Sequence, residues 1–176
     1  MQPRIEVSDQ ITKGYHGTKL DAARGIIANG FARSAPDSGA FLGEGVYFFD
    51  GQVSQAKRWA TEHKAKTGDA IAVIGSNIKF GRMLNLADKE QSDCLNWFAC
   101  EYRLRTKMKV TLATIIDIAA EKLNAQVVKA VRIPKNPSQL METTFSADVE
   151  IILAVRELSN ILSKEIVWEG LAGYAR

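Results

Sequence analysis

The sequence predicts a single α+β domain over residues 1–176. Two helical segments, over 19–29 and 54–66, lie between strand-like apolar runs, and a longer helical region follows over 88–123. Strands separated by scattered helices, without strict βαβ alternation, favour an α+β sheet over a doubly wound one. The chain length suits one domain, and 46% hydrophobic with 24% charged residues is typical of a globular protein.

The first half of the chain predicts two strands, two helices and a long loop. A helix over 19–29 carries apolar residues at helical spacing and is followed by Gly30, a residue type that often ends helices. Glycines, Pro36 and polar residues predict a loop over 31–45. The predicted strands are Ile11–His16 and Val46–Phe49, and the second helix is Ser54–Lys66 with Ala56, Trp59 and Ala60 facing inward.

The second half predicts more strands around a helical middle. An apolar, β-branched run predicts a strand over Ala70–Phe80, with Gly75 as a candidate bulge. The region over 88–123 is long enough for two helices. Four residues at helical spacing in it are expected in the core: Trp97, Phe98, Tyr102 and Leu104. The other predicted strands are Met83–Leu86, Gln126–Ile133, Val149–Val155 and Ile166–Trp168.

Charge and cysteine content narrow the functional classes. A net charge of +3 permits a nucleic-acid partner without requiring one. The basic cluster Arg103, Arg105, Lys107 and Lys109 is interpreted as a solvated helix end. Two cysteines and two histidines without zinc-site spacing predict no metal. The sequence shows no signal peptide and no apolar run of about 20 residues, so we expect a cytoplasmic protein without a membrane partner.

The densest motif lies between residues 15 and 60. It reads Tyr-His-Gly-Thr at 15–18 and, after the predicted loop, Phe-Leu-Gly-Glu-Gly-Val-Tyr-Phe at 41–48. A strand-end His16 followed by Gly17 can offer a ring nitrogen and an unobstructed backbone to a ligand. Tyr47 can offer its aromatic face to a planar group. The Gly-x-Gly at 43–45 lacks the third glycine and the strand–turn–helix context of a dinucleotide fingerprint.

These motifs, in this order, resemble the His-Tyr-Glu class of ADP-ribosyltransferases, which includes poly(ADP-ribose) polymerases and diphtheria-toxin-like enzymes. The resemblance is specific over residues 14–60 and loose over the rest of the chain. It implies a split β-sandwich core with flanking helices. It also implies NAD+ as co-substrate, with nicotinamide as the leaving group.

The third member of the site is assigned by the same resemblance to Glu150. This residue opens the run Glu-Ile-Ile-Leu-Ala-Val-Arg, which looks like the family's glutamate strand. The alternatives are Asp148, Glu142 and Glu157. Asp148 would share the strand face of Glu150, as a neighbour in the site or as a solvated charge at the sheet edge.

The resemblance implies a role for each residue of the motif. His16 and the adjoining Thr18 would bind NAD+, with His16 bonded to the adenosine ribose. Gly17 would bond the nicotinamide carboxamide through its backbone, and Tyr47 would stack on the nicotinamide ring. Glu150 would bond the nicotinamide ribose and stabilise the oxocarbenium ion that forms when nicotinamide leaves.

Further contacts are expected from the loops around this motif. Arg33 and Ser34 are candidates for phosphate or ribose contacts. A family serine that holds the carboxamide aligns with Gln55, so Ser54, one residue away, is a candidate if the helix start is shifted.

The implied function is transfer of a single ADP-ribose to a macromolecular acceptor, with RNA or DNA favoured over protein. By analogy, a small transferase of this kind resembles a bacterial toxin or phage-defence effector with a neutralising antitoxin protein. Three alternatives stay open. They are an NAD glycohydrolase, an inactive binding module, and an NAD-dependent RNA 2′-phosphotransferase, for which a flanking pair of basic residues is expected and is not evident in the sequence.

Overall fold

The computed structural model describes residues 3–35, 40–133 and 149–173. It has a mixed β-sheet with flanking helices, which confirms the predicted α+β class. The elements along the chain are β1 (Glu6–Lys19), α1 (Leu20–Asn29), β2 (Val46–Asp50), α2 (Val53–Trp59), the π-helix η1 (Ala60–Lys64), β3 (Ala70–Asn85), α3 (Lys89–Thr106), α4 (Leu112–Lys122), β4 (Val127–Arg132), β5 (Glu150–Val155), the 3-10 turn η2 (Leu158–Asn160) and β6 (Glu165–Leu171).

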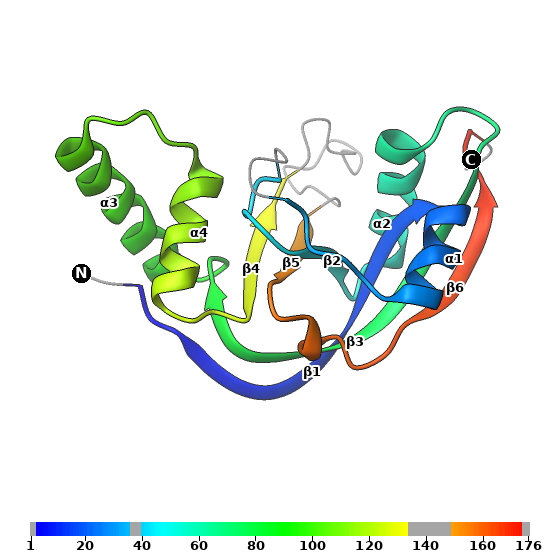
Figure 1. Ribbon diagram of the computed structural model, residues 1–176, viewed down its shortest axis with the longest axis horizontal. Helices are drawn as coiled ribbons and strands as arrows, with labels where there is room; N and C mark the ends of the chain where they lie inside the picture. Colours follow the sequence, from blue (N-terminus) through cyan, green and yellow to red (C-terminus); the bar gives the residue numbers. More distant parts are fainter. Residues whose placement is uncertain (1–2, 36–39, 134–148, 174–176) are drawn as a thin grey trace, which may run out of the picture.

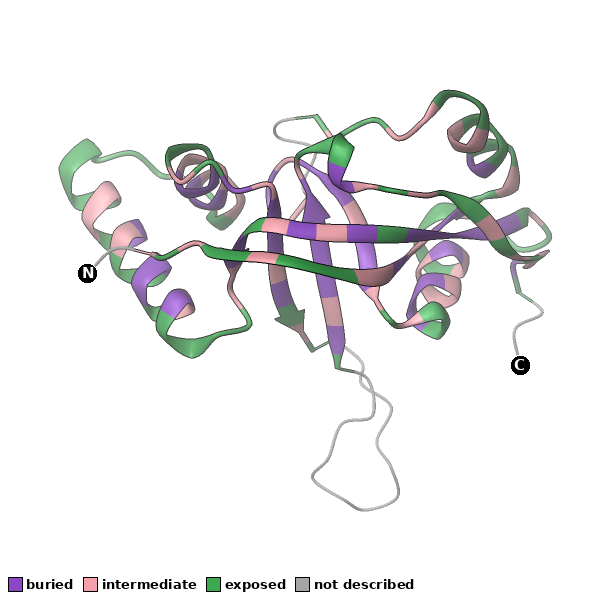
Figure 2. Cartoon of the chain, turned by 90° about the horizontal axis from the view of Figure 1, so that it is seen from below, coloured by how far each residue is buried: buried purple, intermediate pink, exposed green. Residues whose placement is uncertain are grey.

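The six strands follow the order β1-β2-β5-β4-β3-β6, and β1 also pairs with β3. Only the β3–β4 pairing is parallel among these described strands. In Figure 1, the long β1 and β3 curve beneath the three shorter strands β2, β5 and β4. Figure 2 shows these shorter strands crossing behind β1 and β3 at a steep angle. The strands therefore lie in two layers that share edges, with helices at both ends of the molecule.

The two long strands differ from the sequence expectation. The strand predicted over Ile11–His16 runs from Glu6 to Lys19, and the segments predicted as two strands, over 70–80 and 83–86, form the single strand β3. The two segments join at Gly81, whose φ of 58° lies in the left-handed region that glycine adopts without strain. This extended pairing of β1 with β3 explains why the run continues beyond Phe80.

Alternating side chains of the short strands build two cores. Val46 and Phe48 of β2 point between the two layers, together with Ile78 and Phe80 of β3. The opposite face, which includes Phe49, packs against α2, α3 and α4. Three helices, α2, α3 and α4, therefore cover this face of the sheet.

The helices largely follow the prediction. The region over 88–123 does form two helices, α3 and α4, whose first turns are capped by the side chains of Asp88 and Thr111. The second predicted helix ends at Trp59 and continues as the π-helix η1. No helix among the described residues is long and apolar enough to cross a membrane.

For two of the four α3 residues that we expected in the core, the prediction is wrong. Trp97 is 49% exposed and Leu104 is 64% exposed. Phe98 and Tyr102 do pack against the core cluster, each partly buried. Because α4 covers only one side of α3, helical spacing alone does not tell which apolar residues face it. The basic cluster that begins at Arg103 is exposed at the end of α3 and in the following loop, as expected.

Candidate active site

His16 lies on β1 and is fixed by the backbone of β2. Its Nδ1 atom is 2.8 Å from the carbonyl oxygen of Tyr47, which can only accept a hydrogen bond. Nδ1 therefore carries the proton, and Nε2 of the neutral ring is an acceptor. The ring packs edge-on against Phe31 and Phe48, with centroids 5.5 and 5.9 Å away. Burial lowers the pKa of His16 below its usual 6.5, which favours the neutral ring.

The motif residues after His16 lie where β1 and β2 are no longer paired. The β1–β2 ladder contains Gly14 and Tyr15, whereas β1 continues alongside β3 as far as Lys19. Gly17 packs directly on α2, since a Cβ at this position would overlap the carbonyl oxygen of Ala56. Thr18 is buried, at 8% exposure. The glycine is thus required for close packing of a helix against this strand.

Tyr47 is held by its hydroxyl group in the turn that precedes β2. The hydroxyl donates to the carbonyl of Gly43 at 2.6 Å and accepts from the amide of Leu42 at 3.0 Å. Burial raises the pKa of Tyr47 to about 12, so the phenol stays a donor at neutral pH. The ring of Phe41 lies 6.1 Å away, tilted by 51°. Tyr47 therefore has a fixed orientation on the helix-covered face of the sheet.

Glu150 opens β5 and is buried, with its side chain 4% exposed. Oε1 accepts from Nη2 of Arg58 on α2 at 2.9 Å. Oε2 accepts from Nε of Arg132 at 2.6 Å, and Nη2 of the same guanidinium is also 2.6 Å away. The Arg132 guanidinium lies 5.2 Å from the Phe41 ring centre and 5.4 Å from that of Trp59. A buried carboxylate is compensated here by two guanidinium groups, as burial of a charge requires.

Gln52, the residue before α2, fixes the backbone on both sides of Glu150. Its Nε2 donates to the carbonyl of Val149 at 2.7 Å, and its Oε1 accepts from the amide of Ile151 at 2.8 Å. The side-chain amide thus takes the place of a neighbouring strand at the start of β5. The position of Glu150 is set from both its backbone and its carboxylate.

The three predicted residues are spread along the sheet. Tyr47 pairs with Ala154, and Glu150 lies four residues from Ala154 on the same strand. At about 3.4 Å per residue, this corresponds to roughly 14 Å along β5. His16 packs with Phe48, whose side chain points to the face opposite that of Tyr47. This spacing suits separate contacts with an extended ligand, in contrast to a compact proton relay.

The candidates from the loop before β2 and from α2 differ in burial and in bonding. Ser34 pairs with Gly45, accepting its amide hydrogen on Oγ at 3.1 Å and donating its own amide to the Gly45 carbonyl at 3.1 Å. Arg33 and Ser54 are exposed, while Gln55, at the aligned position, is 7% exposed. The helix start is therefore not shifted in a way that buries Ser54.

The alternative acidic residues for the third site position do not share the buried environment of Glu150 where the structure describes them. Glu157 is exposed and its carboxylate caps the short turn η2 by accepting the amide of Ser159 at 3.3 Å. Asp148 and Glu142 lie outside the described residues. Of the two described candidates, only Glu150 is buried, and its carboxylate is paired with Arg58 and Arg132.

Sequence reasoning missed the two arginines. A flanking basic pair is not evident in the sequence, whereas in the structure Arg58 and Arg132 both contact Glu150. Arg58 is 92 positions from Glu150 in the chain, so no local motif joins them. Arg132 ends the strand that pairs with β5 in the register Arg132–Glu150. An antiparallel pairing of the two predicted strands would have been the signal for this second contact.

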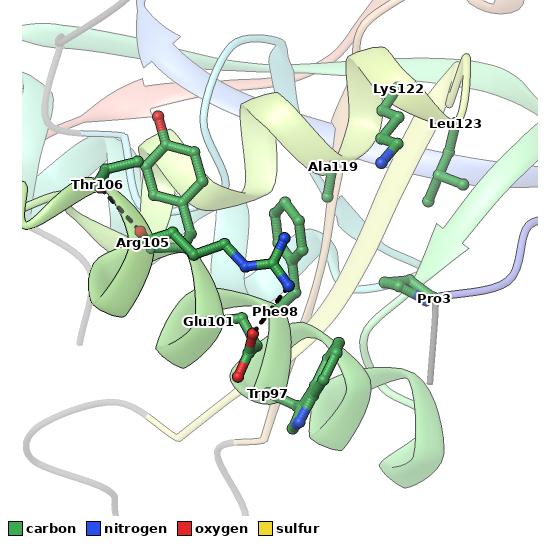
Figure 3. Close-up of a pocket in the computed structure, with 10 residues that line it drawn as sticks. Pro3, Trp97, Phe98, Glu101, Arg105, Thr106, Ala119, Lys122 and Leu123 are labelled. Carbon is green, nitrogen blue, oxygen red and sulfur yellow. Dashed lines mark hydrogen bonds and ion pairs between the residues drawn. The ribbon is translucent and has the colours of Figure 1, made fainter.

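A separate groove lies between α3 and α4 (Figure 3). It measures about 440 Å³ and is lined by Trp97, Phe98 and Tyr102, with Arg105 and Lys122 among its other residues. It contains none of the predicted site residues. Across the described part of the chain, no group of three or more His, Cys, Asp or Glu side chains could hold a metal ion.

Comparison with known proteins adds one match. The family model of the poly(ADP-ribose) polymerase catalytic domain matches residues 5–129, which is most of the chain. The matched range includes His16 and Tyr47 but ends before Glu150. No curated protein matches the chain.

Proposed function

Because this chain belongs to the poly(ADP-ribose) polymerase catalytic domain family and is an NAD+ ADP-ribosyltransferase, we propose that it transfers a single ADP-ribose to a nucleic-acid acceptor. The observation that carries the transfer chemistry is that His16 on β1, Tyr47 on β2 and Glu150 on β5 are each held in a fixed orientation. The roles below are part of this proposal.

His16 and Tyr47 bind the two ends of NAD+. The neutral His16 ring has an acceptor nitrogen, Nε2, suited to a hydroxyl of the adenosine ribose. The edge of β1 at Gly17, where β2 is no longer paired, offers backbone groups to the nicotinamide carboxamide. Tyr47 supplies a ring with fixed orientation for stacking on nicotinamide, because its hydroxyl is bonded at both Leu42 and Gly43.

Glu150 acts on the bond that breaks. As the glycosidic bond between nicotinamide and ribose cleaves, positive charge develops on the ribose. A carboxylate already fixed by protein donors stabilises this charge without reorganising during the reaction. The donors from Arg58, Arg132 and the backbone support of Gln52 provide that preorganisation.

The nucleic-acid acceptor is supported by charge and by the groove on α3. The exposed basic residues at the end of α3 follow the aromatic residues Trp97 and Tyr102, and such a combination binds phosphates and stacks bases. The net charge of +3 agrees with it.

The test is incubation of the protein with labelled NAD+ and a cell lysate, followed by separation of protein from nucleic acid. We expect label in the nucleic-acid fraction, and less label for the charge reversals Arg103→Glu, Arg105→Glu and Lys107→Glu combined, with nicotinamide release unchanged. Label in protein alone, or unchanged transfer by the triple variant, would contradict this acceptor. Nicotinamide release without any transfer would indicate an NAD glycohydrolase.

The presence of an arginine pair suggests a second candidate function, that of an NAD-dependent RNA 2′-phosphotransferase. Such an enzyme needs basic groups for a phosphate, and Arg58 and Arg132 stand together at Glu150. Both guanidinium groups are bonded to Glu150, which favours ADP-ribosyl transfer over this candidate. An RNA carrying a 2′-phosphate separates the two, because only the phosphotransferase removes that phosphate in the presence of NAD+.

The biological role stays a prediction. A toxin or defence effector with an antitoxin, and a cytoplasmic location, rest on analogy and composition. Expression of the protein in a bacterial host, compared with its Glu150→Ala variant, would test toxicity.

A further inference from the structure

Asp117 lies on α4, outside the strands that carry the proposed site, and its carboxylate reaches the loop before β2. Its Oδ1 accepts the amide hydrogen of Glu44 at 2.8 Å. Arg156, directly after β5, donates through Nη1 to the same carboxylate oxygen and to the carbonyl of Glu44 at 3.1 Å. The amide and the carbonyl of one loop residue are therefore both bonded by side chains from other elements.

The close approach of this carboxylate depends on Gly43. This residue has a φ of 77°, in the left-handed region that favours glycine. A Cβ at Gly43 would overlap the carboxylate of Asp117. The turn itself is closed by the Gly43 amide, which donates to the carbonyl of Ala40 at 3.2 Å. The loop is thus shaped to receive Asp117 against its backbone.

The same turn holds the hydroxyl of Tyr47. Leu42 donates to this hydroxyl, and the carbonyl of Gly43 accepts from it. A continuous series of contacts therefore runs from Asp117 through the Gly43–Glu44 backbone to Tyr47. We propose that Asp117 is a positioning residue that sets the orientation of the Tyr47 ring for NAD+. This inference rests on the proposed function, since it assumes that Tyr47 stacks on nicotinamide.

A purely structural role would make a different prediction. If Asp117 only docked α4 on the sheet, its loss would lower stability and the amount of active enzyme but leave the KM for NAD+ unchanged. A positioning role raises KM, because a misplaced ring binds nicotinamide less well before the bond breaks. Loss of the Asp117 carboxylate also frees the amide of Glu44, which then has lost its acceptor.

The experiment compares Asp117→Ala, Asp117→Asn and a matched control, Asp93→Ala. Asp93 is an exposed aspartate on the neighbouring helix α3, paired with Lys89 of the same helix at 2.6 Å. The readouts are KM and kcat for nicotinamide release, the melting temperature, and hydrogen exchange at the amides of Leu42 and Glu44.

For Asp117→Ala we expect kcat/KM to fall about 10-fold to 100-fold, mostly through KM, with faster exchange at both amides. Asp117→Asn keeps an acceptor oxygen for the Glu44 amide, so it should lose less, and it serves as the readout if the alanine variant does not fold. Asp93→Ala should match the wild type. Unchanged KM in the folded Asp117 variants would overturn the proposal, whether or not amide exchange changes. Wild-type protein that does not turn over NAD+ would overturn the proposed function. Amide exchange would still test whether Asp117 holds the loop at Gly43 and Glu44 in place.

Discussion

At the level of single residues, the protonation of His16 most directly links the structure to the proposed binding of NAD+. The carbonyl of Tyr47 fixes the proton on Nδ1, and burial of the ring lowers its pKa below 6.5. The folded protein therefore resists protonation of this ring more than the unfolded chain does. The resulting contribution to stability is fully present above pH 6.5 and is lost as the pH falls through the lowered pKa.

The same property predicts the pH dependence of NAD+ affinity. Protonation turns Nε2 from an acceptor into a donor, so binding through a ribose hydroxyl should weaken only below pH 6.5, with a midpoint under that value. Calorimetric titration with NAD+ across this range measures the midpoint. His16→Ala should bind weakly and show no such transition. A midpoint above 6.5 in the wild type would contradict the account.

At the scale of elements, the packing of α2 on β1 makes a prediction about two glycines. Gly17→Ala should displace α2, because the new Cβ overlaps the carbonyl of Ala56, and we expect loss of stability and of nicotinamide release. Gly25, in the middle of α1, has open space at its Cβ position. Gly25→Ala should therefore stabilise the protein by about 0.5–1 kcal/mol and leave activity intact.

Urea unfolding and nicotinamide release measure both variants. The essential result is that Gly17→Ala lowers the free energy of unfolding whereas Gly25→Ala raises it. Equal stability changes for Gly17→Ala and Gly25→Ala would show that α2 does not constrain the site as described.

The contact between Gln52 and β5 predicts a catalytic effect at a distance from the reacting atoms. Gln52→Ala removes both bonds that flank Glu150, and the amide of Ile151 loses its acceptor. We expect kcat to fall about 10-fold with a small change in KM, since the role proposed for the Glu150 carboxylate lies mainly in the transition state. Val53→Ala, at an exposed neighbouring position, is the control. Steady-state kinetics giving an unchanged kcat for Gln52→Ala would remove Gln52 from the site.

At the scale of the whole molecule, sequence reasoning succeeded where the information is local. The motif residues between Tyr15 and Ala60 lie within one stretch of the chain, and the elements in this stretch follow from hydrophobic spacing and from Gly30. The α+β class followed from the order of these elements. The exact length of β1 and β3 did not, because it depends on their pairing with each other over residues far apart in sequence.

The same limit applies to the site. Arg58 and Glu150 are 92 positions apart, and Asp117 and Glu44 are 73 apart. Each pair is brought together only by the order of strands in the sheet and the placement of α2 and α4. Taken singly, Arg58, Arg132 and Asp117 look like ordinary surface charges of helices and strand ends. Their roles become visible only when the fold places them beside a buried carboxylate or a tight turn.

Glu150 is proposed to stabilise the charge that forms when nicotinamide leaves. Glu150→Gln keeps the shape but removes the charge, and Glu150→Asp keeps the charge but shortens the side chain by one methylene. Because two arginines would lose their carboxylate, Glu150→Gln should also cost about 3–5 kcal/mol of stability, so Glu150→Asp provides the better folded comparison. Glu157→Gln, at an exposed glutamate near the end of β5, is the matched control.

The deciding measurement is the rate of nicotinamide release from NAD+ by these variants, with NAD+ binding measured in parallel. We predict that Glu150→Gln and Glu150→Asp still bind NAD+ but lower kcat by about 100-fold, whereas Glu157→Gln matches the wild type. A folded Glu150 variant that releases nicotinamide at the wild-type rate would contradict the account.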